Sequence, residues 1–143
     1  MRRLFSPLPL LIAAAAIAIP VTTAMLVRPV AAADAGVKSV PFRQESFDAA
    51  RAAGKPILVD VHAPWCPVCA RQQPGIAAAQ RDRRNAGLIV FRLDFDNQKD
   101  AQRPLGVTRQ STLIAFRGRK ETGRLLGVTD KAAIARLIAS TRG

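Results

Sequence analysis

The sequence predicts an α/β fold, a three-layer sandwich in which helices cover both faces of a mixed β-sheet. Apolar runs of strand length alternate with stretches of helix length along most of the chain. Residues 57–62 are almost continuously apolar, which is typical of a central strand buried on both faces. Residues 112–116 and 121–126 flank a basic turn at 117–120, which indicates a hairpin.

The elements before and after the central strand follow from local signals. Residues 34–45 are expected to form a linker and a first edge strand. Residues 46–53 predict a helix, which Gly54 should terminate. Beyond the central strand, a helix is expected from position 66 to about 83, and Pro74 should kink it.

The second half of the chain continues the alternation of predicted strands and helices. Residues 88–94 predict a strand, and Asn97 is expected to cap a short helix over residues 99–105. Thr129 is expected to cap a final helix, which has an apolar face made of Ala133, Ile134, Leu137 and Ile138. The resulting order, β-α-β-α-β-α-β-β-α, suits one mixed and mostly parallel sheet with helices on both sides.

The beginning of the chain predicts export. Residues 1–3 are a short basic start, and an apolar stretch over residues 8–27 ends near the small residues Ala31 and Ala33. We interpret residues 1–33 as a secretory signal that is cut near Ala33. The alternative is an uncleaved anchor, because residues 8–27 have about the length that spans a bilayer.

Both interpretations place the remaining domain outside the cytoplasm, since the basic start stays inside. We therefore expect a domain over residues 46–143 that is periplasmic, or anchored to the inner membrane and facing the periplasm. Membrane contact is expected only if the N-terminal segment is uncleaved. A single domain of this size suits a monomer.

The composition is strongly basic, with 22 Lys and Arg residues against 10 Asp and Glu residues in 143. These basic residues are scattered and form no long run. Aromatic residues do not interleave with the charges as the stacking of single-stranded bases would require, and Tyr is absent. We therefore expect a solvated basic surface and no nucleic-acid partner.

Chemistry is expected at Trp65-Cys66-Pro67-Val68-Cys69, which holds the only two cysteines of the chain. A Cys-x-x-Cys between a strand and a helix indicates a redox pair. At the helix start Cys66 is expected to be partly exposed, beside N–H groups that favour its thiolate, which is the nucleophile. Cys69, one turn later, can attack the mixed disulfide. Pro67 fits the first helical position.

Two other uses of the cysteines are disfavoured. A zinc site takes about four ligands, and the two cysteines with the single histidine, His62, supply at most three. A purely structural disulfide closing so short a loop would constrain the unfolded chain little. We expect no metal, and no cofactor beyond the redox-active disulfide Cys66–Cys69.

Asp60 and His62 are further candidates, on the same face of the central strand. An acid within an apolar run is unusual, since burial should raise its pKa. Asp60 is therefore interpreted as functional, the alternative being a strand-end residue that reaches water. Two interpretations of His62 remain open: a modulator of the site, or a packed neighbour without a role.

Several motifs follow one another in order: Ile57-Leu58-Val59-Asp60, Ala63-Pro64-Trp65-Cys66, Pro74, Gly106-Val107, Thr112-Leu113 and Gly127. In their order and spacing they resemble the thioredoxin family, over about residues 46–141. The stretch from Phe47 to Pro56 is similar to the lead-in of exported disulfide reductases. The resemblance implies that Asp60 helps to deprotonate Cys69. It also implies that a substrate groove is lined by Trp65, Pro67, Ser111 and Thr112.

The chain departs from this family in three places. Pro67-Val68 stands where thioredoxin has Gly-Pro, His62 where Trp is common, and Ser111 where a cis-proline is found. A cis bond before serine costs about 2.5–4 kcal/mol, so we predict a trans Gln110–Ser111 peptide and an altered groove with wider access to Cys66.

The sequence thus predicts a thiol–disulfide oxidoreductase that exchanges disulfides with exported proteins or a redox partner through Cys66 and Cys69. The lead-in resemblance favours a reductase. The alternative is a metal-handling or redox-inactive binding module of the same fold.

Overall fold

The computed structural model describes residues 37–142. Five strands form one sheet, in the order β1-β3-β2-β4-β5. The strands are β1 (Ser39–Pro41), β2 (Pro56–His62), β3 (Ile89–Asp94), β4 (Thr112–Arg117) and β5 (Lys120–Leu126). The helices are α1 (Gln44–Ala52), α2 (Pro67–Arg81), α3 (Lys99–Gln102) and α4 (Lys131–Ala139), with a 3₁₀ turn, η1 (Arg83–Asn85). The predicted order of elements is confirmed.

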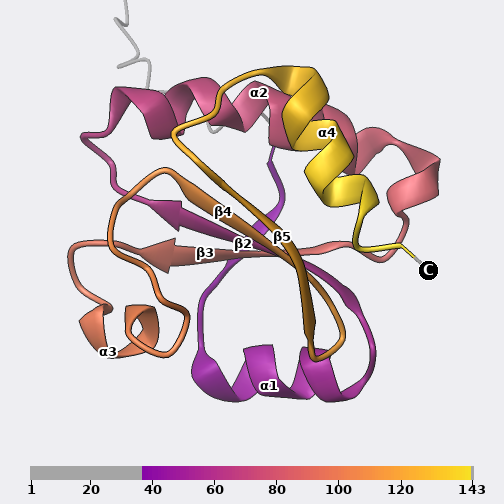
Figure 1. Ribbon diagram of the computed structural model, residues 1–143, viewed down its shortest axis with the longest axis horizontal. Coiled ribbons are helices and arrows are strands. Elements are labelled where there is room, and N and C mark those ends of the chain that lie inside the picture. The colour runs from indigo at the N-terminus through magenta and orange to yellow at the C-terminus, as the bar shows by residue number, and fades with distance from the viewer. Residues whose placement is uncertain (1–36, 143) are drawn as a thin grey trace, which may run out of the picture. The chain divides into compact units, whose positions relative to one another are not determined.

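The sheet is mixed, as expected. β2 lies at its centre, parallel to β3 and antiparallel to β4, and β1 is added parallel to the outer side of β3. Helices α2 and α4 cover one face of the sheet, while α1 and α3 lie on the other (Figure 1). The predicted three-layer sandwich is therefore confirmed.

Each face of the sheet has its own core, because alternate residues of β2 point to opposite sides. Leu58 packs on the α2 and α4 side with Ile76, Ile134 and others. On the α1 side four phenylalanine rings pack together with centroid separations of 5.1 to 6.0 Å, from Phe42, Phe47, Phe91 and Phe116. The two cores hold β2 rigidly, and β2 leads directly into the Cys-x-x-Cys segment.

Two predicted helix caps are wrong. The N-cap of α4 is Asp130 and not Thr129, because a side-chain oxygen of Asp130 accepts the backbone N–H of Ala133 at 2.8 Å. Asn97 does not cap α3, which is also shorter than expected. The Asn97 side chain instead donates to Asp94, at 2.8 Å. A cap is decided by which of several neighbouring polar side chains reaches the open N–H groups.

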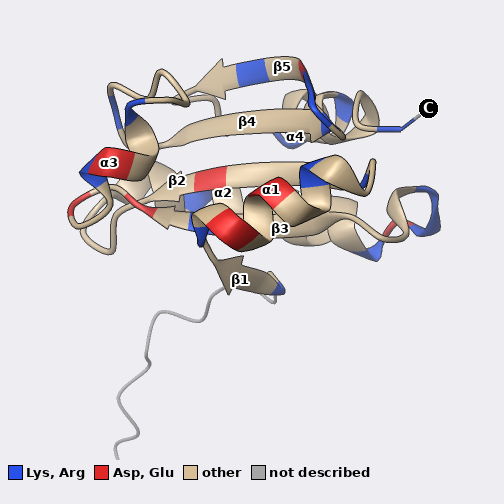
Figure 2. Cartoon of the chain, turned by 90° about the horizontal axis from the view of Figure 1, so that it is seen from below, with Lys and Arg blue, Asp and Glu red and all other residues tan. Residues whose placement is uncertain are grey.

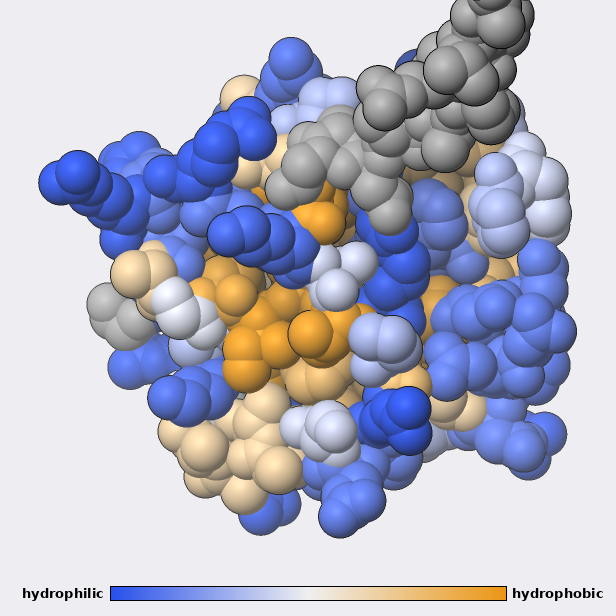
Figure 3. Space-filling model, turned by 180° about the vertical axis from the view of Figure 1, so that it is seen from behind, coloured by the Kyte–Doolittle hydropathy of each residue, from blue (hydrophilic) through white to orange (hydrophobic). Residues whose placement is uncertain are grey.

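The basic residues are spread over several elements and over both ends of the sheet (Figure 2). The face shown in Figure 3 has an apolar area at its centre, with hydrophilic residues around it. Across residues 37–142, no helix is both long and apolar enough to cross a membrane. The predictions for residues 1–33 lie outside the described residues.

Candidate active site

The two cysteines lie where β2 passes through a short turn into α2. Cys66 is the N-cap residue of α2, with extended backbone angles, and Pro67 occupies the first helical position as predicted. The backbone N–H of Cys69 donates a hydrogen bond to the Cys66 sulfur at 3.1 Å. The Cys66 sulfur therefore takes the place that a serine or aspartate oxygen has in an ordinary helix cap.

The prediction that Cys66 is partly exposed is wrong. Its exposed fraction is 3%, against 0% for Cys69, and neither cysteine is in a disulfide. Because the sulfur turns back over the first turn of α2 to accept the Cys69 N–H, it packs in one small cluster with Ala63 and Cys69, against Val68 and Phe95. The expected wider access to Cys66 is not found.

The two thiols have different surroundings. Burial raises the pKa of Cys69 to about 12, and its hydrogen bond with Cys66 raises the pKa further, while backbone groups of Ala63 and Ser111 act in the opposite direction. The Cys69 sulfur also lies 3.9 Å from the carbonyl oxygen of Val61. At neutral pH Cys69 is therefore a thiol, and it must lose its proton before it can act as a nucleophile.

Asp60 lies on β2 beneath α2 and is fully buried, so the alternative of a solvent-exposed strand end is wrong. Its Oδ2 accepts a hydrogen bond from Gln73 at 3.1 Å and lies 3.5 Å from a guanidinium nitrogen of Arg92. Burial raises the pKa of Asp60, although Gln73, Arg92 and His62 each pull it down.

Sequence reasoning missed Gln73 and Arg92. Arg92 is the parallel-strand partner of Asp60 in the register of β2 and β3, which a sequence alone does not give. Gln73 lies one helical turn after Cys69. The signal that was available is the pair Gln72-Gln73, two polar residues on a helix that packs against a sheet, where apolar residues are expected.

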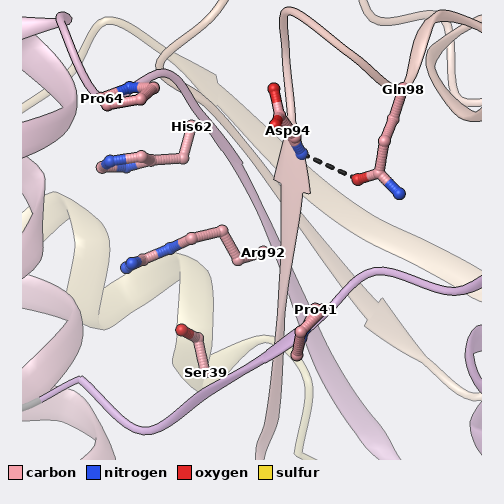
Figure 4. A pocket seen from close by; sticks show the side chains of 7 residues that line it. All are labelled: Ser39, Pro41, His62, Pro64, Arg92, Asp94 and Gln98. Carbon is pink, nitrogen blue, oxygen red and sulfur yellow. Dashed lines mark hydrogen bonds between the residues drawn. The ribbon is translucent and has the colours of Figure 1, made fainter.

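His62 lies on the same strand face as Asp60, as predicted, with its Nδ1 4.0 Å from Asp60 Oδ2. The side chains of His62 and Arg92 also line a pocket of about 470 Å³ (Figure 4), together with Ser39, Pro41, Pro64, Asp94 and Gln98. His62 is 18% exposed, so it connects the buried carboxylate with the pocket. Its modulating role stays a prediction.

Trp65 and Pro67 lie on the surface on either side of Cys66. Trp65 is 60% exposed, and its indole N–H donates to a carboxylate oxygen of Asp96 at 2.8 Å. Asp96 was not expected here; it belongs to the loop after β3. The hydrogen bond fixes an apolar ring beside the cysteine pair, where a substrate protein can contact it.

The Gln110–Ser111 peptide is trans, as predicted, since residues 37–142 contain no cis peptide bond. Ser111 instead has a φ of 57°, the left-handed region. Its N–H donates to the carbonyl of Val61 at 2.9 Å, and its carbonyl accepts from Gly127 N–H and from Gln72 Nε2.

The predicted groove role of the Ser111 and Thr112 backbone is therefore wrong. The internal hydrogen bonds of Ser111 engage both of its backbone groups, and its exposed fraction is 6%. Thr112 is 4% exposed and pairs with β2 and β5 on its two sides. Of the predicted groove residues, only Trp65 and Pro67 are on the surface.

In the described part of the chain, three or more His, Cys, Asp or Glu residues are nowhere grouped as a metal would require. The arrangement defines a class of protein instead. A thiol at a helix start, a second buried thiol one turn later and a buried carboxylate form a site for thiol–disulfide exchange.

Comparisons with known proteins agree with this class. The model of the thioredoxin family matches residues 38–140, and the chain therefore belongs to the thioredoxin family. Thioredoxins are thiol–disulfide oxidoreductases, and so is this protein.

Individual relatives are moderately similar. Thioredoxin-2 of Saccharomyces cerevisiae is 35% identical over 95 residues, which are 66% of this chain and 88% of the yeast protein. A bifunctional thioredoxin reductase/thioredoxin of Mycobacterium leprae is 35% identical over 82 residues, 57% of this chain but 18% of that protein.

Among solved structures, Trxlp from Edwardsiella tarda is 39% identical, with a TM-score of 0.66, over 68% of this chain and 95% of the other. Thioredoxin NaTrxh from Nicotiana alata shares the fold with a TM-score of 0.63 at 24% identity, over 73% and 93% of the two chains.

Proposed function

We propose that this protein reduces disulfide bonds of exported proteins in the periplasm and is itself re-reduced by a redox partner. The observation that supports the exchange chemistry is that the two cysteines have different surroundings. Cys66 accepts a backbone N–H at the start of α2, whereas Cys69 is fully buried and burial raises its pKa to about 12. Such a pair supports one attacking and one resolving thiol.

The proposed cycle follows from this asymmetry. The thiolate of Cys66 attacks a substrate disulfide, forms a mixed disulfide and releases one substrate thiolate. Cys69 then attacks Cys66, with the buried Asp60 as the base, and releases the second substrate thiol. The Cys66–Cys69 disulfide that remains must accept two electrons from a partner before the next cycle. Trp65 offers the substrate an exposed apolar surface next to Cys66.

Support for export comes from the basic start and the apolar stretch of residues 8–27. Cell fractionation of the full chain, with the mass of the purified product, tests this. We expect a periplasmic product that begins near residue 34, or an anchored product of full mass. A full-length product that remains in the cytoplasm contradicts the proposed location.

Direction of electron flow is tested by equilibrating the cysteine pair with glutathione buffers. A reductase should have a potential near that of thioredoxin, about −270 mV, and a strong oxidant one near −120 mV. We expect the lower value, together with reduction of insulin by the purified protein. An oxidising potential would contradict the proposed direction. Stoichiometric bound metal without insulin reduction would favour a binding module instead.

A further inference from the structure

The two oxygens of the Asp60 carboxylate have different surroundings, although the whole residue is buried. Oδ2 accepts the hydrogen bond from Gln73 and is the oxygen nearest Arg92 and His62. Oδ1 is buried and has no hydrogen-bond partner within residues 37–142. A buried carboxylate oxygen without a partner is costly, so its retention calls for a reason in the chemistry of the site.

Gln73 is the residue that creates this difference. Its side chain is nearly inaccessible, with 3% of the residue exposed. A guanidinium nitrogen of Arg92 donates to Gln73 Oε1 at 2.6 Å, and because arginine has no acceptor, the amide must turn its Nε2 toward Asp60. The same Nε2 donates to Asp60 Oδ2 at 3.1 Å and to the carbonyl of Cys69 at 3.2 Å.

One amide group thus links the carboxylate with the backbone of the resolving cysteine. We propose that Gln73 is a positioning residue for disulfide exchange: it holds Asp60 by Oδ2, so that Oδ1 is left to receive the Cys69 proton. This inference rests on the exchange reaction proposed above and adds the residue that orients its base.

Resolution moves one proton and one electron pair. Cys66 is joined to a substrate sulfur; the Cys69 thiol gives its proton to Asp60 Oδ1, directly or through one water. The Cys69 sulfur bonds to the Cys66 sulfur, and the bond between Cys66 and the substrate breaks. The substrate sulfur leaves with the electron pair and takes a proton from solvent, and Asp60 later releases its own. The cysteine pair is oxidised by two electrons and the substrate disulfide is reduced.

The polar, charged and titratable groups that face Asp60 come from three elements. They are His62 on β2, Arg92 on β3 and, on α2, Gln73, a polar and uncharged residue that links Asp60 to the Cys69 carbonyl, whereas its partner on β4 is the apolar Leu113. Burial raises the pKa of Asp60, and the hydrogen bond from Gln73 is the largest influence that lowers it. Removal of the amide should therefore make Asp60 a carboxylate only at higher pH.

The test is the pH dependence of resolution in the variant Gln73→Leu. The reduced protein is mixed with 5,5′-dithiobis(2-nitrobenzoate), and the second release of thionitrobenzoate, which requires Cys69, is followed by stopped flow. We expect the midpoint of this phase to rise by about one pH unit, so that resolution is about tenfold slower below it. The first release, from attack by Cys66, should keep its pH dependence.

The neighbouring glutamine supplies a matched control. Gln72 is fully buried on the same helix, but its amide donates to the carbonyls of Ser111 and Val128 and not to Asp60. Gln72→Leu removes an equivalent buried amide and should leave the midpoint unchanged. Equal shifts in both variants, or no shift in Gln73→Leu, would overturn the proposal.

If Gln73→Leu does not fold, a measurement on the unaltered protein tests the same proposal. The side-chain ¹⁵N–¹H signals of Gln73 should move with pH as Asp60 titrates, because its Nε2 donates to that carboxylate. The signals of Gln72 should stay in place. Signals of Gln73 that do not follow the titration would overturn the proposal. The stopped-flow readout uses a small disulfide and the ¹⁵N–¹H readout uses none, so a failure to reduce exported proteins would leave both unaffected and would count against the proposed function alone.

Discussion

The backbone N–H of Cys69 donates to the sulfur of Cys66 at 3.1 Å, so one cysteine caps the helical turn that contains the other. The contact places the Cys66 sulfur at the open N–H groups of the first turn of α2. The Cys69 sulfur does not lie at these N–H groups, and burial raises its pKa to about 12. This difference is the basis for proposing Cys66 as the attacking thiol and Cys69 as the resolving thiol.

The first prediction follows from these roles. Cys69→Ser should accumulate mixed disulfides between Cys66 and substrate proteins, because the resolving thiol is missing. Cys66→Ser should form none and should lose insulin reduction by at least about a hundredfold. Non-reducing gels of the two variants after mixing with an oxidised substrate measure this. Mixed disulfides of similar yield in both variants would contradict the assignment.

The burial of Cys66 affects how fast this thiol should react with reagents of different size. Since only 3% of the residue is exposed, a bulky maleimide should react with Cys66 more slowly than a small methanethiosulfonate does. The small reagent should still prefer Cys66 over Cys69 at neutral pH. Equal rates for the two single-cysteine variants with the small reagent would show that the two thiols do not differ.

A second prediction concerns Asp60 and stability. Burial raises its pKa in the folded state above the ordinary value near 3.8, so the unfolded chain releases this proton at lower pH. The contribution of Asp60 to the free energy of unfolding is therefore fully present at low pH. It falls as the pH rises from the pKa of Asp60 in the unfolded chain to its pKa in the folded protein. Asp60→Asn, which keeps an acceptor for Gln73, should gain unfolding free energy relative to wild type as pH rises through this window.

Asp94 is the matched control, because it has the opposite shift. A hydrogen bond from Asn97 lowers the pKa of Asp94, so this carboxylate stabilises the fold above its unfolded pKa and loses that effect as pH falls. Asp94→Asn should therefore be less stable than wild type at neutral pH, with the difference vanishing in acid. Urea unfolding at several pH values measures both variants. A stability change of the same sign in both variants at neutral pH would contradict the opposite pKa shifts of Asp60 and Asp94.

The residues that sequence reasoning found and missed at this site differ in a physical way. The position of the cysteine pair, the first-turn proline and the buried Asp60 depend on local spacing along one strand and one helix. Arg92 and Gln73 reach Asp60 from a neighbouring strand and from the helix above it, so strand register and packing decide their contacts.

The exposure of Cys66 was predicted wrongly and the backbone conformation of Ser111 was not predicted, for a similar reason. The burial of Cys66 depends on the direction of one side chain at the helix cap. The conformation of Ser111 depends on tertiary hydrogen bonds to Val61, Gly127 and Gln72. Intrinsic preference disfavours a positive φ for serine, so no local rule predicts it.

A third prediction concerns Trp65, the only tryptophan of the chain, which is 60% exposed beside Cys66. Trp65→Ala should lower kcat/KM for insulin by about tenfold, since a large exposed aromatic residue often supplies over 1 kcal/mol of protein binding. Its reaction with a small disulfide should change less than about twofold. Asp96→Ala, which leaves the ring but removes its 2.8 Å hydrogen bond, should have an intermediate effect on insulin. Equal losses for insulin and the small disulfide would show that Trp65 acts on the cysteines themselves.

The last prediction concerns Ser111→Pro, which would place proline where similar proteins have it. Proline requires a φ near −65°, whereas Ser111 has 57°, and proline has no N–H to donate to the carbonyl of Val61. The variant should lose about 3 kcal/mol or more of unfolding free energy, and the loop should be disturbed. Ser111→Gly separates the two causes, because glycine accepts a positive φ and keeps the N–H. It loses the serine hydroxyl, which donates to the carbonyl of Gln110 at 2.6 Å, so its stability should lie within about 1 kcal/mol of wild type. A stabilising Ser111→Pro substitution would show that the loop prefers the backbone of its relatives, and that the contacts of Gln72 and Gly127 do not hold it in its present form.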